Sequence, residues 1–210
     1  PRALFTALKH FRIATDLFEA ETPVSKPSGL FFFEATDLSR PEVARHASRL
    51  KERYTPPERA KVLLLLPQTR AKPFHRSREH ARIIKEVEQK LGDRKRLVHV
   101  CTFAAPFGIV PFEIDEVYPL SQYEVALPLD HETVSYVVEQ VTGYISRCHY
   151  QEVVLLNNAE TWGNRIISAV KQVCRKRKIR ATILSPDNRW NKQALNSVSE
   201  ALQKAVGEQV

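Results

Sequence analysis

The most constraining feature of this sequence is the alternation of short apolar runs with longer amphipathic segments. Residues 61–66, Lys-Val-Leu-Leu-Leu-Leu, are typical of a buried strand, and residues 77–91 have the apolar spacing of a helix. The alternation predicts an α/β fold with a mostly parallel sheet and helices on both of its faces. The other expected strands cover residues 30–33, 97–101, 152–156 and 179–184. The other expected helices cover residues 41–55, 131–148, 160–177 and 190–206.

Two stretches fall outside this alternation. Residues 1–28 are mixed in character and contain two prolines, so we treat them as an N-terminal extension before a core domain of residues 29–210. Residues 102–129 are rich in proline and show little periodicity, and we expect a long loop there. Such a loop inside a compact domain is more often functional than idle.

The first helix of the core is expected to begin at Ser39, which is a favourable N-cap, with Pro41 in its first turn. Its apolar positions are expected to face the core. The charged positions expected to face water are Arg45, Arg49, Lys51 and Arg53.

Composition narrows the classes of partner. The formal net charge is +8 and the isoelectric point is near 9.5. Such a balance favours a polyanionic partner, most simply nucleic acid, although an ordinary basic protein can have the same composition. No apolar run approaches the roughly 20 residues that span a membrane, and we expect neither a membrane segment nor a signal peptide. A cytoplasmic location follows as an expectation.

The cysteines predict neither a disulfide framework nor a metal site. There are three, Cys101, Cys148 and Cys174, and they are widely spaced. No Cys-x-x-Cys motif or close His/Cys pair suggests zinc, and no cofactor motif is present. Cys148 and Cys174 fall on apolar helix faces and are expected in the core.

The densest chemistry lies in residues 67–80, here called the crossover segment, which joins the strand at 61–66 to the following helix. Open α/β sheets bind ligands where parallel strands end. Ser77 is a plausible helix N-cap, and His80 begins the buried face in the first turn. Lys72, Arg70 and Arg76 add charge that suits a phosphate or a carboxylate. The plainer alternative is a solvated basic loop beside a packed histidine.

The pattern Pro67-x4-Lys72-Pro73-Phe74-x2-Ser77-x2-His80 resembles a signature of the archaeosine synthase family, relatives of archaeal tRNA-guanine transglycosylase. The family signature is Pro-Cys-x3-Lys-Pro-Tyr-x2-Ser-x2-His. Residues 105–113, with 116–119 and 122–123, resemble a second conserved stretch of the same family. One position departs from the pattern, since Gln68 stands where the family has cysteine.

The resemblance implies a fold and a chemistry. The fold is a three-layer α/β/α sandwich similar to uracil-DNA glycosylase. The implied reaction adds an amine, lysine in the better-understood members, to the nitrile of 7-cyano-7-deazaguanine (preQ0) in tRNA. The implied partners are tRNA, lysine or another amine donor, and a radical-SAM or transglycosylase protein.

Physical chemistry then suggests roles for the matching residues. The nitrile nitrogen needs a proton donor, which Lys72 or His80 can provide, and the amine needs a base, which Glu113 or Glu124 can provide. The catalytic group therefore comprises Lys72, His80, Ser77 and Glu113. The expected substrate-binding residues are Pro67, Gln68, Pro73, Phe74, Phe107, Tyr123 and Cys101. Phosphate contacts are expected from Arg70, Arg76, Arg175, Lys176, Arg177 and Lys178, although the run 175–178 also neutralises a helix dipole.

Within these groups, Phe74, Phe107 and Tyr123 are expected to stack on the heterocycle. Gln68 cannot replace a cysteine nucleophile, so Cys101 is of interest as a thiol at the same sheet edge; its alternative role is that of a small buried hydrophobe.

Two other functions remain compatible with the sequence. One is a non-catalytic protein that binds tRNA or supports a partner enzyme, which the loss of the motif cysteine favours. The other is a glycosylase-like enzyme acting on a modified or damaged base, although Lys72 stands where such glycosylases have their water-activating aspartate.

Overall fold

The computed structural model describes residues 30–157, 159–186 and 191–207, so the proposed extension at 1–28 lies outside the described residues. Its main sheet has five strands in the order β4-β3-β2-β6-β7. Four of them are parallel, and β4 runs antiparallel to β3. The strands are β2 (Val62–Pro67), β3 (Val98–Ala104), β4 (Gly108–Pro111), β6 (Glu152–Leu156) and β7 (Arg180–Leu184).

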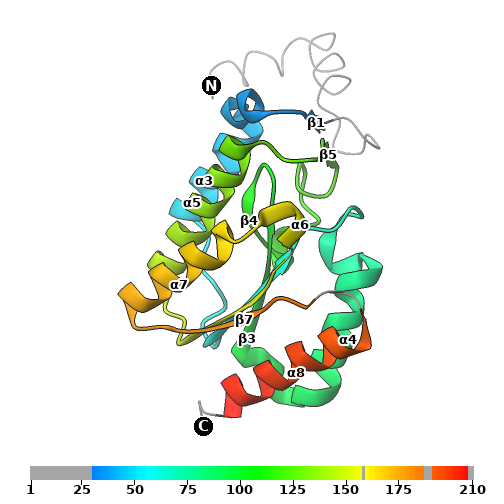
Figure 1. Cartoon of the computed structure of the whole chain (residues 1–210), viewed down its shortest axis with the longest axis vertical. Helices are drawn as coiled ribbons and strands as arrows, with labels where there is room; N and C mark the ends of the chain where they lie inside the picture. Colours follow the sequence, from blue (N-terminus) through cyan, green and yellow to red (C-terminus); the bar gives the residue numbers. More distant parts are fainter. Residues whose placement is uncertain (1–29, 158, 187–190, 208–210) are drawn as a thin grey trace, which may run out of the picture.

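Helices cover both faces of this sheet, which makes the molecule a three-layer α/β/α sandwich (Figure 1). Alternate residues of β2 point to opposite faces, as expected of a strand. Leu63 and Leu65 join the core beneath α5 and α7, while Leu64 and Leu66 join the core beneath α4 and α8. The helices are α3 (Pro41–Glu52), α4 (Arg78–Leu91), α5 (His131–Arg147), α6 (Ala159–Trp162), α7 (Arg165–Arg177) and α8 (Lys192–Gly207).

The predicted α/β class and the parallel sheet are therefore confirmed. Most element boundaries differ from expectation by a residue or two, but the single helix expected at 160–177 is wrong. It is divided into α6 and α7, and Gly163 between them has a φ of 55°.

The long loop expected at 102–129 is also wrong. Strand β3 continues to Ala104, β4 adds an edge to the main sheet, and β5 (Tyr123–Val125) pairs in parallel with β1 (Leu30–Phe32) to form a second, two-stranded sheet. Strands of three or four residues carry too few side chains to show a periodicity, so pairing with a neighbouring strand decides them.

The start of α3 also differs from expectation. Ser39 ends a short 3-10 helix, and its hydroxyl donates to the Thr36 carbonyl at 2.8 Å. Arg40 is the N-cap residue instead, and Pro41 begins the helix as predicted. Arg45 and Arg49 of α3, and Arg53 at its C-cap, are exposed as expected.

A third core, here called the aromatic bed, lies beside the ends of the parallel strands. Its rings are Phe32, Phe74, Phe107 and Tyr123, all 3% exposed or less. Phe107 and Tyr123 meet edge to face with centroids 4.9 Å apart, and Phe32 lies 5.6 Å from Phe107 in the same manner. The bed fixes the crossover segment, which contributes Phe74, against the second sheet.

Gly108 allows β4 and α5 to approach each other closely. Its φ is +76°, and an added Cβ would lie 2.4 Å from Gln140 Cβ. We expect Gly108→Ala to lower the free energy of unfolding by about 3 kcal/mol, because it combines overpacking with an unfavourable backbone conformation. Thermal unfolding measures this as a melting temperature lower by roughly 6–12 °C.

Gly143→Ala is the matched control. Gly143 lies within α5, and the nearest atom to an added Cβ is Arg147 Nη1 at 3.8 Å. Alanine is the better helix former by about 1 kcal/mol, so this variant should melt at the same temperature or higher. Equal losses in the two variants would contradict the close approach at Gly108.

Candidate functional site

The crossover segment begins where β2, the central strand, ends. The backbone N–H of Gln68 donates to the Phe103 carbonyl at 3.1 Å, and the Gln68 Oε1 atom accepts from the Ala105 N–H at 2.8 Å. Gln68 therefore joins the crossover segment to the chain that follows β3. Its side chain thus forms a structural hydrogen bond at the position where the family signature has cysteine.

Ser77 and His80 hold the shape of the crossover segment. Ser77 caps α4 as predicted, accepting from the His80 N–H at 3.2 Å. The His80 Nε2 atom donates to the Pro67 carbonyl at 2.9 Å. Burial lowers the pKa of His80 to about 4, although backbone hydrogen bonds with Pro67 and Phe74 act in the opposite direction. Since both side chains are buried, we assign them a positioning role rather than contact with a substrate.

The rings expected to stack on a heterocycle are packed against one another. Phe74, Phe107 and Tyr123 form the aromatic bed, in which Phe74 and Phe107 each meet Tyr123 edge to face. Burial also raises the pKa of the Tyr123 hydroxyl, so it stays protonated. These rings form the packed layer beneath the site. Pro73, which is half-buried, immediately precedes Phe74 in the chain.

Lys72 lies directly on this bed. Its Nζ atom is 4.2 Å from the centroid of the Tyr123 ring and 5.8 Å from that of Phe74, within the range of cation–π attraction. Nζ also lies 3.4 Å from the Arg70 carbonyl oxygen. Burial lowers the pKa of Lys72, and the negative charge of Glu124 offsets part of that effect. Lys72 is thus a half-buried ammonium group that gives up its proton more readily than an ordinary lysine.

Glu113 does not share this site. Its Oε2 atom lies 3.2 Å from His99 Nε2 and accepts from the Tyr54 hydroxyl at 3.3 Å. His99 pairs with Leu63 near the beginning of β2, whereas Lys72 follows the end of that strand. Burial alone would raise the pKa of Glu113, but its contacts with His99 and Tyr54 lower it on balance. The carboxylate whose charge reaches Lys72 is that of Glu124.

Cys101 is not at the sheet edge, which corrects the expectation from sequence. It lies opposite Leu65 in the middle of β3 and has no exposed surface. Its Sγ atom is 3.5 Å from His99 Nε2. Burial, together with the nearby charge of Glu113, holds the pKa of this thiol well above its usual value. Cys101 is therefore a protonated core residue, and Cys148 and Cys174 are buried as predicted.

The predicted phosphate-binding residues fall into two groups, which lie at opposite ends of the parallel strands. Arg70 and Arg76 are exposed on the crossover segment, and Arg76 pairs with Glu116. The run 175–178 is exposed where α7 ends and β7 begins, beside the first residue of β6. A single small ligand cannot reach both groups.

Asp115, which no sequence pattern singled out, fastens residues 112–120 to the crossover segment. Its side chain has no exposed surface and accepts from the His75 backbone N–H at 2.8 Å and from His75 Nδ1 at 2.6 Å. Nothing in the local sequence distinguishes Asp115 from its neighbours Glu113 and Glu116. Its burial depends on a contact between segments 40 residues apart.

In the described part of the chain, no cluster of three or more His, Cys, Asp or Glu side chains is arranged to hold a metal ion. None of its helices is long and apolar enough to cross a membrane.

Comparison with known families places most of the chain in one domain. The family described as "Domain of unknown function (DUF5591)" matches residues 43–202. A crystal structure titled AF0587, a protein of unknown function, aligns with 76% of this chain and 48% of its own, with a TM-score of 0.51 and 19% identity. That likeness concerns the fold alone.

Curated relatives are considerably longer than this chain. Archaeosine synthase subunit alpha of Methanosarcina acetivorans is 36% identical over 138 residues, which cover 65% of this chain and 21% of the relative. The tRNA-guanine(15) transglycosylase of Saccharolobus solfataricus is 29% identical over 158 residues, 74% of this chain and 30% of the relative. The match therefore spans between a fifth and a third of these two relatives.

The link through Asp115 predicts a large effect of removing one buried carboxylate. Asp115→Ala leaves the backbone N–H and the ring N–H of His75 without their acceptor, so we expect a loss of about 2–3 kcal/mol of unfolding free energy. Urea unfolding measures the loss, and Asp115→Asn, which keeps one acceptor oxygen, should lie between.

Glu116→Ala serves as the control, because Glu116 also contacts His75 and Arg76 but is 52% exposed. Exposed ion pairs contribute about 1 kcal/mol or less. If both alanine variants unfold at the same urea concentration, Asp115 does not fasten the two segments.

Proposed function

Because the chain belongs to the archaeosine synthase family, with the DUF5591 domain covering most of its length, we propose that it is a tRNA-modifying domain of archaeosine formation. Its reaction is the addition of an amine, lysine by preference, to the nitrile of preQ0 in tRNA. The domain works in the cytoplasm, and a radical-SAM or transglycosylase protein is its partner.

Lys72 is the observation that carries this proposal. It occupies the motif lysine position, lies at the edge where parallel strands end, and is half-buried above Tyr123. A general acid works best when its pKa is close to the working pH, and burial lowers that of Lys72 in this direction. The pKa of a solvated surface lysine is not lowered in this way.

Side chains of this protein can supply both proton transfers that the proposed addition requires. The amine nitrogen of the free lysine substrate forms a bond to the nitrile carbon. One π electron pair of the nitrile then moves to the nitrile nitrogen. The Lys72 ammonium group gives that nitrogen a proton, and Glu124 takes a proton from the attacking amine. The product is a substituted amidine, and no oxidant or reductant is needed.

A second function is favoured by one specific contact. Gln68 replaces the signature cysteine and uses its side-chain oxygen to bind the Ala105 N–H at 2.8 Å. If family chemistry needs that thiol, this chain binds preQ0-tRNA without modifying it and supports a partner enzyme.

Incubation with preQ0-tRNA and lysine, followed by mass spectrometry of the nucleosides, separates the two functions. A lysine adduct is expected from the unaltered chain, and Lys72→Ala should slow its formation by about 100-fold or more, since proton transfer in the transition state is lost. Lys95→Ala, at an exposed lysine that pairs with Glu88, is the control and should leave the rate unchanged. Binding of the tRNA without an adduct would instead favour the supporting role.

The pH dependence of the rate follows from the pKa of Lys72. Because a proton donor must be protonated, the rate should fall as the pH rises through the pKa of Lys72. Burial places this fall below the usual lysine value of about 10.4. The charge of Glu124 raises the pKa, so Glu124→Gln should move the alkaline fall to lower pH as well as slow the reaction. An alkaline fall that does not move in Glu124→Gln would exclude Lys72 as the titrating group.

A further inference from the structure

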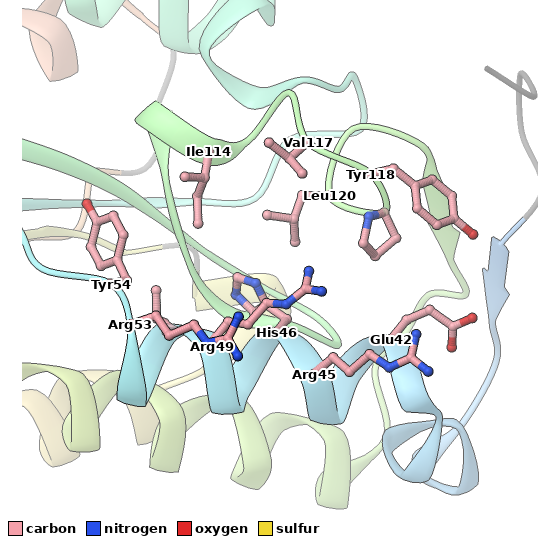
Figure 2. A pocket seen from close by; sticks show the side chains of 12 residues that line it. Glu42, Arg45, His46, Arg49, Arg53, Tyr54, Ile114, Val117, Tyr118 and Leu120 are labelled. Carbon is pink, nitrogen blue, oxygen red and sulfur yellow. The ribbon is translucent and has the colours of Figure 1, made fainter. Parts of the chain in front are cut away.

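A groove lies between α3 and residues 112–120, on the other side of that segment from the crossover contacts. It encloses about 450 Å³. Figure 2 shows Arg45, Arg49 and Arg53 along α3 on one side of it and Ile114, Val117 and Leu120 on the other. We call it the α3 groove. The further lining residues are Glu42, His46, Leu50, Tyr54, Tyr118 and Pro119.

The arginine side of the groove carries positive charge that the described part of the chain does not neutralise. Arg45 and Arg49 lie one turn apart on α3 and Arg53 is its C-cap residue, so the three form a row about 12 Å long. All three are exposed, and within the described ranges none of them forms an ion pair. The carboxylate lining the groove belongs to Glu42, which already lies 3.8 Å from Arg40.

The floor of the groove adds no compensating charge. His46 is buried there, and its Nε2 atom donates to the Ile109 carbonyl at 2.7 Å. Burial lowers the pKa of His46, and the charge of Arg49 lowers it further. His46 is therefore neutral, and the three guanidinium groups determine the sign of the groove.

The opposite side is apolar and partly open. Val117 is 55% exposed, and it stands beside Ile114, Leu120 and the ring of Tyr118. A guanidinium row facing an apolar and aromatic wall matches the two halves of a nucleotide, since phosphates bind arginine forks and bases pack on apolar or aromatic surfaces. An acidic peptide would match the arginines but supply no flat base for the wall. The volume is within the range of pockets that hold small ligands.

We propose that the α3 groove binds a single-stranded segment of RNA, with its phosphates on Arg45, Arg49 and Arg53 and a base against Val117 and its neighbours. This role is separate from the proposed amine addition, because it involves other residues and needs no preQ0. Asp115 connects the two surfaces: it belongs to the segment that walls the groove, and it holds His75 of the crossover segment. RNA in the groove would thus lie on the same segment that supports the Lys72 site.

Binding of an unmodified single-stranded RNA of about 12 nucleotides to the full chain, measured by fluorescence anisotropy, tests the proposal. The triple variant Arg45→Ala/Arg49→Ala/Arg53→Ala should bind at least about tenfold more weakly at about 0.1 M salt. The slope of log K against log salt should also be less steep by about 2, because three phosphate contacts are lost. The RNA lacks preQ0, so the result does not depend on catalysis.

Arg59→Ala/Arg94→Ala/Arg96→Ala is the matched control, because it removes the same charge from three exposed arginines outside the groove. It should weaken binding by less than about threefold. Val117→Asp should weaken binding by about fivefold or more through repulsion of phosphate, whereas Val117→Ser should stay close to the unaltered chain.

Three results would overturn the proposal. Equal losses in the two arginine triples would mean that only net charge matters. A polyglutamate peptide of matched charge that binds as tightly as RNA, and depends equally on the α3 arginines, would assign the groove to an acidic protein partner. Absence of RNA binding by the unaltered chain at about 0.05 M salt would exclude RNA outright.

Discussion

Strand β2 has no face that can meet water, and this constraint determines the rest of the architecture. Its residues from Val62 to Leu66 have no exposed surface, and their side chains alternate between two separate cores. Each face therefore requires its own layer of helices, and parallel neighbours on both sides complete the sheet. The end of β2 is thereby fixed at the centre of the edge where the parallel strands end.

The chain leaving β2 is held by polar groups that are buried or half-buried. Gln68 binds the Ala105 N–H, His80 donates to the Pro67 carbonyl, and Asp115 binds His75. Buried polar groups are costly unless they are paired, so each bond restricts the crossover segment to one path. Lys72 is then held over Tyr123, and its lowered pKa is a consequence of that path.

The same segment that contributes Asp115 forms one wall of the α3 groove. On one side it holds His75, and on the other it presents Ile114 and Val117 to the arginines of α3. In our proposals Lys72 transfers a proton and the α3 arginines bind phosphate, so we expect substitutions at these two places to have different effects.

Local sequence patterns correctly predicted those features that depend only on residues close together in the chain. The apolar run of β2, the cap at Ser77 and the burial of His80 follow from neighbours in the chain, and the structure agrees with each. Strand β5 was missed because its partner β1 is distant in sequence, and β4 was missed because its four residues are too few to show a periodicity.

The candidate site was predicted less completely, for the same physical reason. Lys72 could be found from its motif, but its aromatic bed and its neighbour Glu124 depend on the second sheet. Cys101 was misplaced because β3 continues beyond it to Ala104, and Glu113 was misplaced because the antiparallel β4 carries the chain back along β3 toward His99. Asp115 has no sequence signal that distinguishes it from neighbouring acids.

Direct NMR titration of the Lys72 side chain tests this arrangement most directly. With ¹³Cε-labelled lysine, and with the signal assigned by its loss in Lys72→Arg, the titration midpoint should lie below the usual value of about 10.4. A midpoint at or above that value would mean that Lys72 is fully solvated. It would then contradict both its burial over Tyr123 and its role as the proton donor.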